Sequence, residues 1–327
     1  MKYSIHGILK VRTNVTVPIP EYFLDSFRGT PDLTILSRKK LNFRRPVDNR
    51  ILKGNYYFWR DGDKLLIDYD FMNAKLSVEK LFGRTKVECT NSLRRFCTGE
   101  SWQNLVFAIL SVKLIQKGYT FIHCGGLSYG GEGVLIAGMQ DTGKSSTVLS
   151  LLDGRDFKFL GDDFLILGGR RIYAYPKEVR VSPRTLRGRV GGQDLKEKIL
   201  KNRLLTTFVE RYLKKDITRF LKIPRKYIVE KCDIGKIFVI GGYGEEKAIS
   251  VDADRALNAI STLSLQMPNL LETYLDMYYH LFDVPVFKLV REKEKMIRKA
   301  VETAECFVVT GPHLEGYSRA IKKVLGA

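Results

Sequence analysis

The most informative segment of this 327-residue chain reads Gly133-Val134-Leu135-Ile136-Ala137-Gly138-Met139-Gln140-Asp141-Thr142-Gly143-Lys144-Ser145. Its first half is an apolar run typical of a buried strand, and its second half fits G-x-x-x-x-G-K-[ST], the Walker A phosphate loop. A helix is expected from Thr147 to Leu152. Because strand, loop and helix follow in the order that phosphate binding requires, the segment predicts a nucleotide site. An ordinary βα turn is the alternative.

Each defined position of this motif has a physical task in binding phosphate. Gly138 and Gly143 allow tight turns that direct backbone amides inward, toward phosphate oxygens. The positive end of the following helix adds to this attraction. Lys144 is expected to reach the β and γ phosphates as a mobile cation, and the Ser145 hydroxyl is suited to bind Mg²⁺.

Three more residues complete the expected nucleotide site, namely Asp141, Thr142 and Ser146. Asp141 places a carboxylate on a loop that binds anions. A residue of this type tolerates a positive φ, so it can serve the loop geometry with its side chain turned outward. The alternative is a contact between this carboxylate and Mg²⁺ or the acceptor.

A second acidic element follows the loop at Gly161-Asp162-Asp163, where a short strand from Lys158 is expected to end. A strand that ends in Asp near a phosphate loop is the Walker B arrangement, in which a carboxylate holds Mg²⁺. Two adjacent carboxylates offer more, because one can hold the metal while the other accepts the proton of an attacking hydroxyl. The alternative is that both simply cap a turn.

The rest of the chain predicts a mixed α/β protein with two domains. Residues 1–98 are rich in β-branched and aromatic residues, and Asp61-Gly62 predicts a hairpin. Residues 99–327 alternate between strand and helix patterns, which indicates an α/β or mixed α+β domain. Strands are expected at 119–123, 133–138, 158–163, 236–240, 285–290 and 306–309, and helices at 100–117, 194–223, 252–266, 269–282, 292–304 and 315–325.

The net charge of +19 predicts attraction to an acidic partner. Residues 184–231 hold 15 Lys and Arg against 5 Asp and Glu, and smaller basic clusters lie at Arg38-Lys39-Lys40 and Arg44-Arg45. These residues form either a solvated cationic face or a docking surface for an acidic molecule. Nucleic acid is possible but not favoured, because no RNA-binding signature or zinc finger accompanies the charge.

Composition excludes several other classes of protein. A hydrophobic share of 44% excludes a wholly disordered chain, and no run approaches 18 apolar residues, so no membrane partner is expected. The five cysteines are scattered without a C-x-x-C pair, and the first residues lack the apolar core of a signal peptide. We therefore expect a cytoplasmic protein without a zinc ribbon or a disulfide framework.

Taken together, His123, the strand at 133–136, Gly143-Lys144-Ser145-Ser146 and Leu160-Gly161-Asp162-Asp163 resemble the catalytic domain of HPr kinase/phosphorylase, a bacterial protein-serine kinase. The Gly-Asp-Asp tripeptide is also similar to the second kinase motif of phosphoenolpyruvate carboxykinases, which share this phosphate-loop fold. The resemblance is close over 120–168, and the pattern at 284–289 supports it weakly.

This resemblance implies a P-loop kinase domain of the HPr kinase type behind a β-rich N-terminal domain. Lys144 and the loop amides would bind the β phosphate of ATP, and Ser145 and Asp163 would bind Mg²⁺. Asp162 would accept the proton of the acceptor hydroxyl, on a protein serine or a small molecule. His123 matches a histidine near the active centre of that family. The resemblance also implies a homo-oligomer.

Two other functions remain open at this stage. The chain could be a module that binds or hydrolyses nucleotide and is coupled to nucleic acid or a protein through 184–231. It could also bind nucleotide without catalysis, although the intact Gly143-Lys144-Ser145 and the paired acids argue against that reading.

Overall fold

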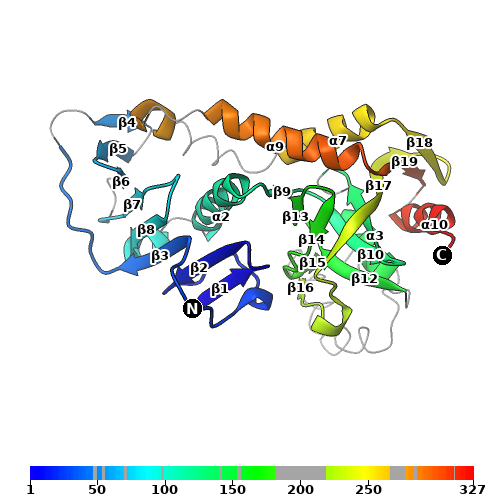
Figure 1. Cartoon of the computed structure of the whole chain (residues 1–327), viewed down its shortest axis with the longest axis horizontal. Helices are drawn as coiled ribbons and strands as arrows, with labels where there is room; N and C mark the ends of the chain where they lie inside the picture. Colours follow the sequence, from blue (N-terminus) through cyan, green and yellow to red (C-terminus); the bar gives the residue numbers. More distant parts are fainter. Residues whose placement is uncertain are drawn as a thin grey trace, which may run out of the picture. The chain divides into compact units, whose positions relative to one another are not determined.

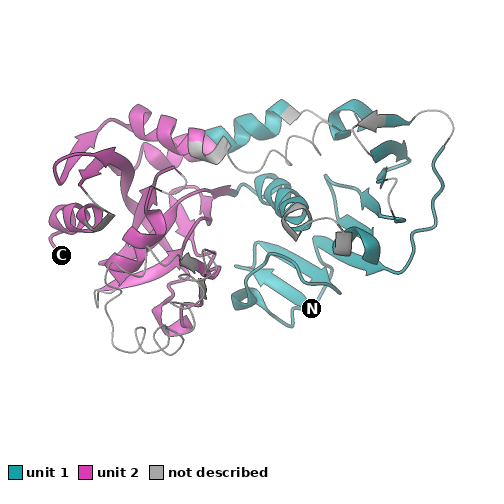
Figure 2. Cartoon of the chain, turned by 180° about the vertical axis from the view of Figure 1, so that it is seen from behind, with its two compact units in different colours: residues 1–120, 268–294 teal, residues 121–267, 295–327 magenta. Residues whose placement is uncertain are grey.

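The computed structural model of the chain describes residues 1–46, 50–53, 56–69, 72–96, 99–139, 142–152, 156–181, 219–265, 277–282, 286–312 and 314–327. These residues form both mixed sheets and helices (Figure 1), so the predicted mixed α/β class is confirmed. The chain divides into two compact units (Figure 2). Residues 1–120 and 268–294 form the first unit, and residues 121–267 and 295–327 form the second.

The described part of the first unit forms a mixed sheet. Its strands are β1 (Lys2–Ile5), β2 (Leu9–Thr13), β3 (Leu33–Arg38), β4 (Ile51–Lys53), β5 (Tyr56–Asp61), β6 (Lys64–Asp68), β7 (Lys75–Glu79) and β8 (Thr85–Thr90). They lie in the order β1-β2-β3-β8-β7-β6-β5-β4, with β3 parallel to both β2 and β8 and the other neighbours antiparallel. A two-residue turn with Gly62 at φ 56° joins β5 to β6, which confirms the predicted hairpin.

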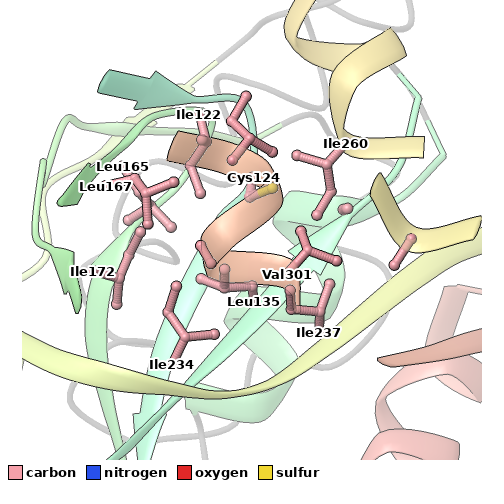
Figure 3. Packing of buried hydrophobic residues seen from close by; sticks show 14 of the residues in the cluster. Ile122, Cys124, Leu135, Leu165, Leu167, Ile172, Ile234, Ile237, Ile260 and Val301 are labelled. Carbon is pink, nitrogen blue, oxygen red and sulfur yellow. The ribbon is translucent and has the colours of Figure 1, made fainter. Parts of the chain in front are cut away.

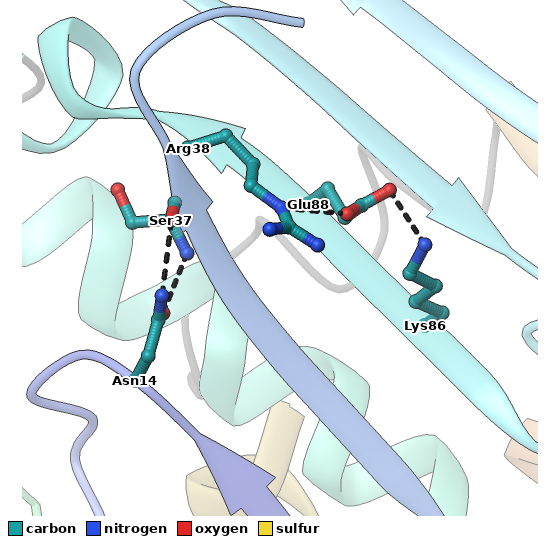
Figure 4. A network of polar contacts seen from close by, with 5 residues as sticks. All are labelled: Asn14, Ser37, Arg38, Lys86 and Glu88. Atoms are coloured by element: carbon teal, nitrogen blue, oxygen red, sulfur yellow. Dashed lines mark hydrogen bonds and ion pairs between the residues drawn. The ribbon is translucent and has the colours of Figure 1, made fainter.

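Polar side chains connect the neighbouring strands of this sheet (Figure 4). Glu88 on β8 accepts a hydrogen bond from Arg38 Nε on β3 at 3.1 Å and pairs with Lys86 Nζ at 2.9 Å. Partial burial raises the pKa of Glu88, but the two cations outweigh this effect and hold the pKa below its ordinary value. Asn14 exchanges two hydrogen bonds with the backbone of Ser37. Because both cations reach solvent and Glu88 is only partly buried, each ion pair contributes at most about 1 kcal/mol to stability.

Helix α2 (Gly99–Gln116) confirms the predicted helix and packs against the first sheet. It is apolar on nearly every side, as expected for a helix enclosed by protein. Trp102 Nε1 donates to the Thr16 carbonyl at 3.3 Å, and the buried Lys113 Nζ donates to the carbonyls of Leu81, at 3.2 Å, and Gly83. Burial lowers the pKa of Lys113 to about 8. In the described part of the chain, no helix has the length and apolar character needed to cross a bilayer.

The two compact units therefore divide the chain differently from the expected domains, 1–98 and 99–327. Residues 99–120 join the first unit, because the contacts of α2 are made with that sheet. The segment 268–294 also returns to the first unit, where Tyr278 Oη donates to the Val78 carbonyl at 3.0 Å. Neither association follows from a local pattern, because both depend on contacts between residues far apart in sequence.

The second unit holds the predicted phosphate loop on a larger mixed sheet. Its strands are β9 (Thr120–Ile122), β10 (Gly125–Tyr129), β11 (Glu132–Ala137), β12 (Phe157–Gly161), β13 (Leu165–Gly168), β14 (Arg171–Tyr173), β17 (Lys231–Tyr243), β18 (Lys247–Val251) and β19 (Glu305–Gly311). The order is β12-β10-β11-β17-β14-β13-β9, and β19 pairs with the later residues of β17 and with β18. The strands β11, β17 and β19 are mutually parallel, so their carboxyl ends meet at one edge.

Helices cover both faces of this sheet, which is why its central strands β11 and β17 bury apolar side chains on both faces. The helices are α3 (Lys144–Leu152), α7 (Ala253–Leu265), α9 (Val286–Val301) and α10 (Leu314–Leu325). On one face Leu135 and Ile237 pack with residues of α7 and of the end of α9 (Figure 3). On the other face their neighbours Ile136 and Phe238 pack with residues of α3 and α10.

Two predicted elements differ from the structure. Residues 286–290, expected as a strand, begin helix α9, because this short apolar run continues into a 16-residue amphipathic pattern. Residues 219–221, expected at the end of a basic helix, form β16 (Arg219–Leu221), which pairs with β15 (Val179–Val181). Most of the predicted helix 194–223 lies outside the described residues, as does most of 269–282.

The sheet of the second unit predicts where stability resides. Phe238→Ala should lower the free energy of unfolding by about 3–5 kcal/mol, because this fully buried ring leaves a cavity. Tyr243→Ala, on the same strand but 86% exposed, should change it by less than about 0.5 kcal/mol. Urea unfolding followed by circular dichroism measures both variants, and equal losses would contradict this core.

Candidate functional site

The phosphate loop leaves β11 and returns as helix α3, with Lys144 closing it from inside. Lys144 Nζ donates to the Gly138 carbonyl at 2.8 Å and to the Met139 carbonyl at 3.0 Å. Only 5% of this residue is exposed. An ammonium group has three N–H donors, so these two bonds draw the start of the loop onto its end and leave one donor for a ligand.

Glycine and threonine fix the backbone of this loop. A Cβ at Gly138 would lie 2.7 Å from Thr142 Oγ1 and 2.8 Å from Ile240 Cγ1, so only glycine fits there. Gly143 adopts φ 99°, a conformation that disfavours other residues. Thr142 Oγ1 donates to the Met139 carbonyl at 2.7 Å. The Thr142 amide also donates to the Met139 carbonyl, at 3.4 Å, so in this structure both donors of Thr142 hold the loop.

Helix α3 begins directly at Lys144. Both the amide and the hydroxyl of Thr147 donate to the Gly143 carbonyl at 2.9 Å, which anchors the first turn. The first amides of a helix have no acceptor within it, so this end attracts anions. Ser145 and Ser146 lie half-buried in this turn, as the motif predicts. Asp141 lies outside the described residues.

The strand order brings the end of β12 to the same edge as the loop. Both β11 and β12 are antiparallel to β10, so they run in the same direction. Gly161 at the end of β12 pairs with Gly126, and the adjacent Gly125 pairs with Ile136 of β11. A Cβ at Gly125 would lie 2.5 Å from Val148 Cγ2 of α3 and 3.7 Å from Asp162 Oδ1. Glycine at this position therefore lets α3 and the Asp162 carboxylate approach the sheet closely.

Asp162 presents an unusual buried carboxylate. It is 3% exposed, and neither carboxylate oxygen has a hydrogen-bond partner of normal geometry among the described residues. Burial, and then the adjacent Asp163, raise the pKa of Asp162 to about 7. The nearby Ser145 hydroxyl and Lys144 ammonium act in the opposite direction. Buried polar oxygens are nearly always satisfied, so this pair is suited to a ligand or a transferable proton.

Asp163 sits in a strained turn at the end of this strand. Its φ is 68°, and the Phe164 amide donates to the Asp162 carbonyl at 2.9 Å across it. A bond from residue i+2 to residue i around a positive φ forms the rare, strained type of γ-turn. Strain of this kind in a non-glycine residue concentrates at functional sites.

His123, between β9 and β10, lies beside both halves of the site. Burial and the Lys144 charge lower the pKa of this imidazole, and Asp163 opposes them. At neutral pH the ring is therefore uncharged and can accept or donate a hydrogen bond. It also packs edge-on against Phe164, with ring centroids 5.7 Å apart.

Lys177 also belongs to this cluster, although sequence reasoning missed it. Burial lowers the pKa of Lys177, and the charge of Asp163 raises it in part. Its Nζ lies 5.0 Å from the centroid of the Phe164 ring. The segment is held against β12, because the Tyr175 amide donates to the Leu160 carbonyl at 3.0 Å. The only signal in the sequence is a Lys soon after the paired acids, which has no defined spacing.

The structure thus gathers the described members of the predicted set around one sheet edge: Lys144, Ser145, Asp162, Asp163 and His123. Within the described ranges no cluster of three or more His, Cys, Asp or Glu side chains suits a metal. A hydroxyl and a carboxylate are nevertheless sufficient for Mg²⁺, which usually keeps waters and uses substrate phosphates as ligands. Ser145 and Asp163, the predicted ligands, supply such a pair, and both lie close enough to Asp162 to change its pKa.

The predicted acidic-partner surface at 184–231 cannot be placed, since residues 182–218 lie outside the described part of the chain. Comparison with protein-family models and with curated proteins gives no match. Functional assignment therefore depends on the motif and on the geometry above.

The raised pKa of Asp162 predicts how its replacement changes stability. The ordinary value of 3.8 applies to the unfolded chain, so between about pH 4 and 7 the folded protein keeps a proton that the unfolded chain has lost. Stability due to this group therefore falls as pH rises. Asp162→Asn should stabilise the magnesium-free protein by on the order of 2–4 kcal/mol at pH 7.5 and by much less at pH 4.

Thermal or urea unfolding in EDTA across this pH range measures the difference. Asp156→Asn, which changes an exposed carboxyl just before the same strand, is the matched control. Its difference in unfolding free energy from the native protein should not depend on pH. A difference for Asp162→Asn that does not grow with pH would contradict the buried, unsatisfied state of this carboxyl.

Proposed function

We propose that this chain is a Mg²⁺- and ATP-dependent kinase of the HPr kinase type, which transfers a phosphoryl group to a hydroxyl acceptor. The observation that carries the proposal is the buried, unsatisfied carboxylate of Asp162. It lies close enough to Lys144, the lysine of the Walker A motif, for the ammonium charge to lower its pKa. A phosphate loop alone supports nucleotide binding. A proton acceptor beside the expected position of the terminal phosphate supports transfer to an alcohol.

Nucleotide binding follows from the loop. The amides around Gly143 and the first turn of α3 would surround the phosphates, and Lys144 would direct its remaining N–H to them. Because Lys144 is already held by the Gly138 and Met139 carbonyls, its ammonium loses little further freedom on binding.

Ser145 and Asp163 would hold the magnesium ion. Held there, the ion would supply positive charge that offsets the negative charge developing on the transferred phosphoryl group. The backbone turns at Asp163, so this residue no longer continues the line of β12. Asp162 and Asp163 can therefore have different roles. Lys177 lies near Asp163, whose charge favours the protonated form of this lysine.

Asp162 would accept the proton of the acceptor hydroxyl as the new O–P bond forms and the bond to the leaving phosphate breaks. A pKa near neutrality suits a general base, and in the reverse direction the same group would donate the proton. His123, uncharged beside Asp163, would orient the acceptor or a water by hydrogen bonding.

The kinase proposal predicts a separation between binding and transfer. Lys144→Met should weaken Mg²⁺·ATP binding at least about tenfold, because it removes a cation from the phosphates. Asp162→Asn should bind Mg²⁺·ATP within a few-fold of the native protein but lower phosphoryl transfer by about 10²–10⁴. Calorimetry measures binding, and labelled ATP with a cell extract measures transfer and identifies the acceptor.

Lys158→Met, an exposed lysine on β12, is the control for charge and should leave both properties unchanged. A native protein that binds no purine nucleotide with Mg²⁺ present would contradict the proposal. Unchanged transfer by Asp162→Asn would remove this residue from the reaction. Nucleotide turnover that depends on added RNA or DNA instead of a hydroxyl acceptor would favour the coupled NTP-hydrolysing module.

A further inference from the structure

The carboxyl end of β17 lies next to the phosphate loop, on the side away from the paired acids. β17 is parallel to β11 and adjacent to it, whereas β12 lies two strands away on the other side of β11. The ends of β12 and β17 are therefore three strand spacings apart, about 14 Å. A nucleoside triphosphate that has its terminal phosphate at Asp162 and extends along this edge past the loop would meet β17.

Direct contacts join this strand end to the loop. A Cβ at Gly138 would lie only 3.0 Å from the Ile240 carbonyl, so the backbones of β17 and the loop touch. A Cβ at Gly241 would lie 3.8 Å from Thr142 Cγ2. Gly241 has φ 139° and no side chain, so the surface beside the loop is open at this position. At Gly242 the missing side chain instead makes room for Thr310 of β19, because a Cβ there would lie 2.5 Å from Thr310 Cγ2.

Tyr243 stands directly after these glycines. It is 86% exposed, and its side chain has no hydrogen bond, ion pair or ring contact with any described residue. Its backbone is nevertheless fixed, because it pairs with Gly311 of β19 and because Tyr317 Oη donates to the Gly242 carbonyl at 3.3 Å. On the other side Thr310 Oγ1 donates to the Glu245 carbonyl at 2.6 Å.

We propose that Tyr243 is the platform on which the base of the bound nucleotide stacks. The inference rests on the proposed nucleotide function and assigns the part of the ligand that the phosphate loop does not contact. An exposed aromatic ring on a rigid strand end offers stacking area at little cost in conformational entropy. The site therefore binds a nucleoside triphosphate with a planar base, with the phosphates in the loop and the base over Tyr243.

Stacking is tolerant of base identity, because every base has a π face. Stacking needs no hydrogen bond from the Tyr243 hydroxyl, so the aromatic ring alone makes the proposed contact. This distinguishes the proposal from a role of Tyr243 in proton transfer or in folding.

The test compares two ligands that share the phosphates and differ in the base. Calorimetry measures Mg²⁺ complexes of ATP and of inorganic tripolyphosphate on the full chain. Tyr243→Ala should weaken ATP binding by about ten- to a hundredfold. The same variant should leave tripolyphosphate binding within twofold, and Tyr243→Phe should bind ATP as the native protein does. Tyr279→Ala, another exposed tyrosine, is the matched control and should change neither affinity.

Three results would overturn the inference while leaving the proposed function intact. In the first, Tyr243→Ala weakens the binding of ATP and of tripolyphosphate equally. In the second, Tyr243→Ala weakens the binding of neither ligand. In the third, the native protein binds tripolyphosphate as tightly as ATP. A native protein that binds neither ligand would instead contradict the proposed function itself, and the stacking platform with it.

Discussion

Asp162 holds a carboxylate away from water at the end of β12, with no hydrogen bond of normal geometry from the described residues to either oxygen. Burial of an unpaired charge costs several kcal/mol, so the group keeps its proton up to about neutral pH. Folding alone gives no reason to retain such a residue, because an apolar side chain would pack there at lower cost. The cost is explained if the carboxylate meets a hydroxyl and a phosphate that the protein binds.

The fold supports this arrangement through small residues. β10 lies between the loop strand and the acidic strand, and Gly125 on it leaves the room that Asp162 and α3 occupy. Gly138 does the same on the other side, where β17 touches the loop. Substituents at either glycine would push the loop away from the strand ends that carry the proposed ligands. The site thus depends on close approach between backbones as much as on its charged groups.

Local patterns in the sequence predict much of this site. The loop from Gly138 to Ser145 and the paired acids are short motifs whose geometry is fixed by nearby backbone, so their roles follow from spacing. The hairpin at Gly62 is predicted for the same reason. The helix predicted at 292–304 is confirmed by α9, but the start of α9 at 286–290 is predicted wrongly as a strand, because a short apolar run fits a strand or a buried helix equally well. Lys177, the place of α2 and the return of 268–294 depend on contacts between distant residues, which no periodicity reports.

The central claim is that Lys144, Ser145 and the two acids converge on one metal–phosphate complex. A crystal structure with a non-hydrolysable ATP analogue and Mn²⁺ in place of Mg²⁺ tests it most directly, since anomalous scattering locates the ion. The account predicts the ion at Ser145 Oγ and Asp163, and the terminal phosphate between Lys144 and Asp162. An ion bound elsewhere, or a nucleotide whose terminal phosphate points away from Asp162, would contradict it.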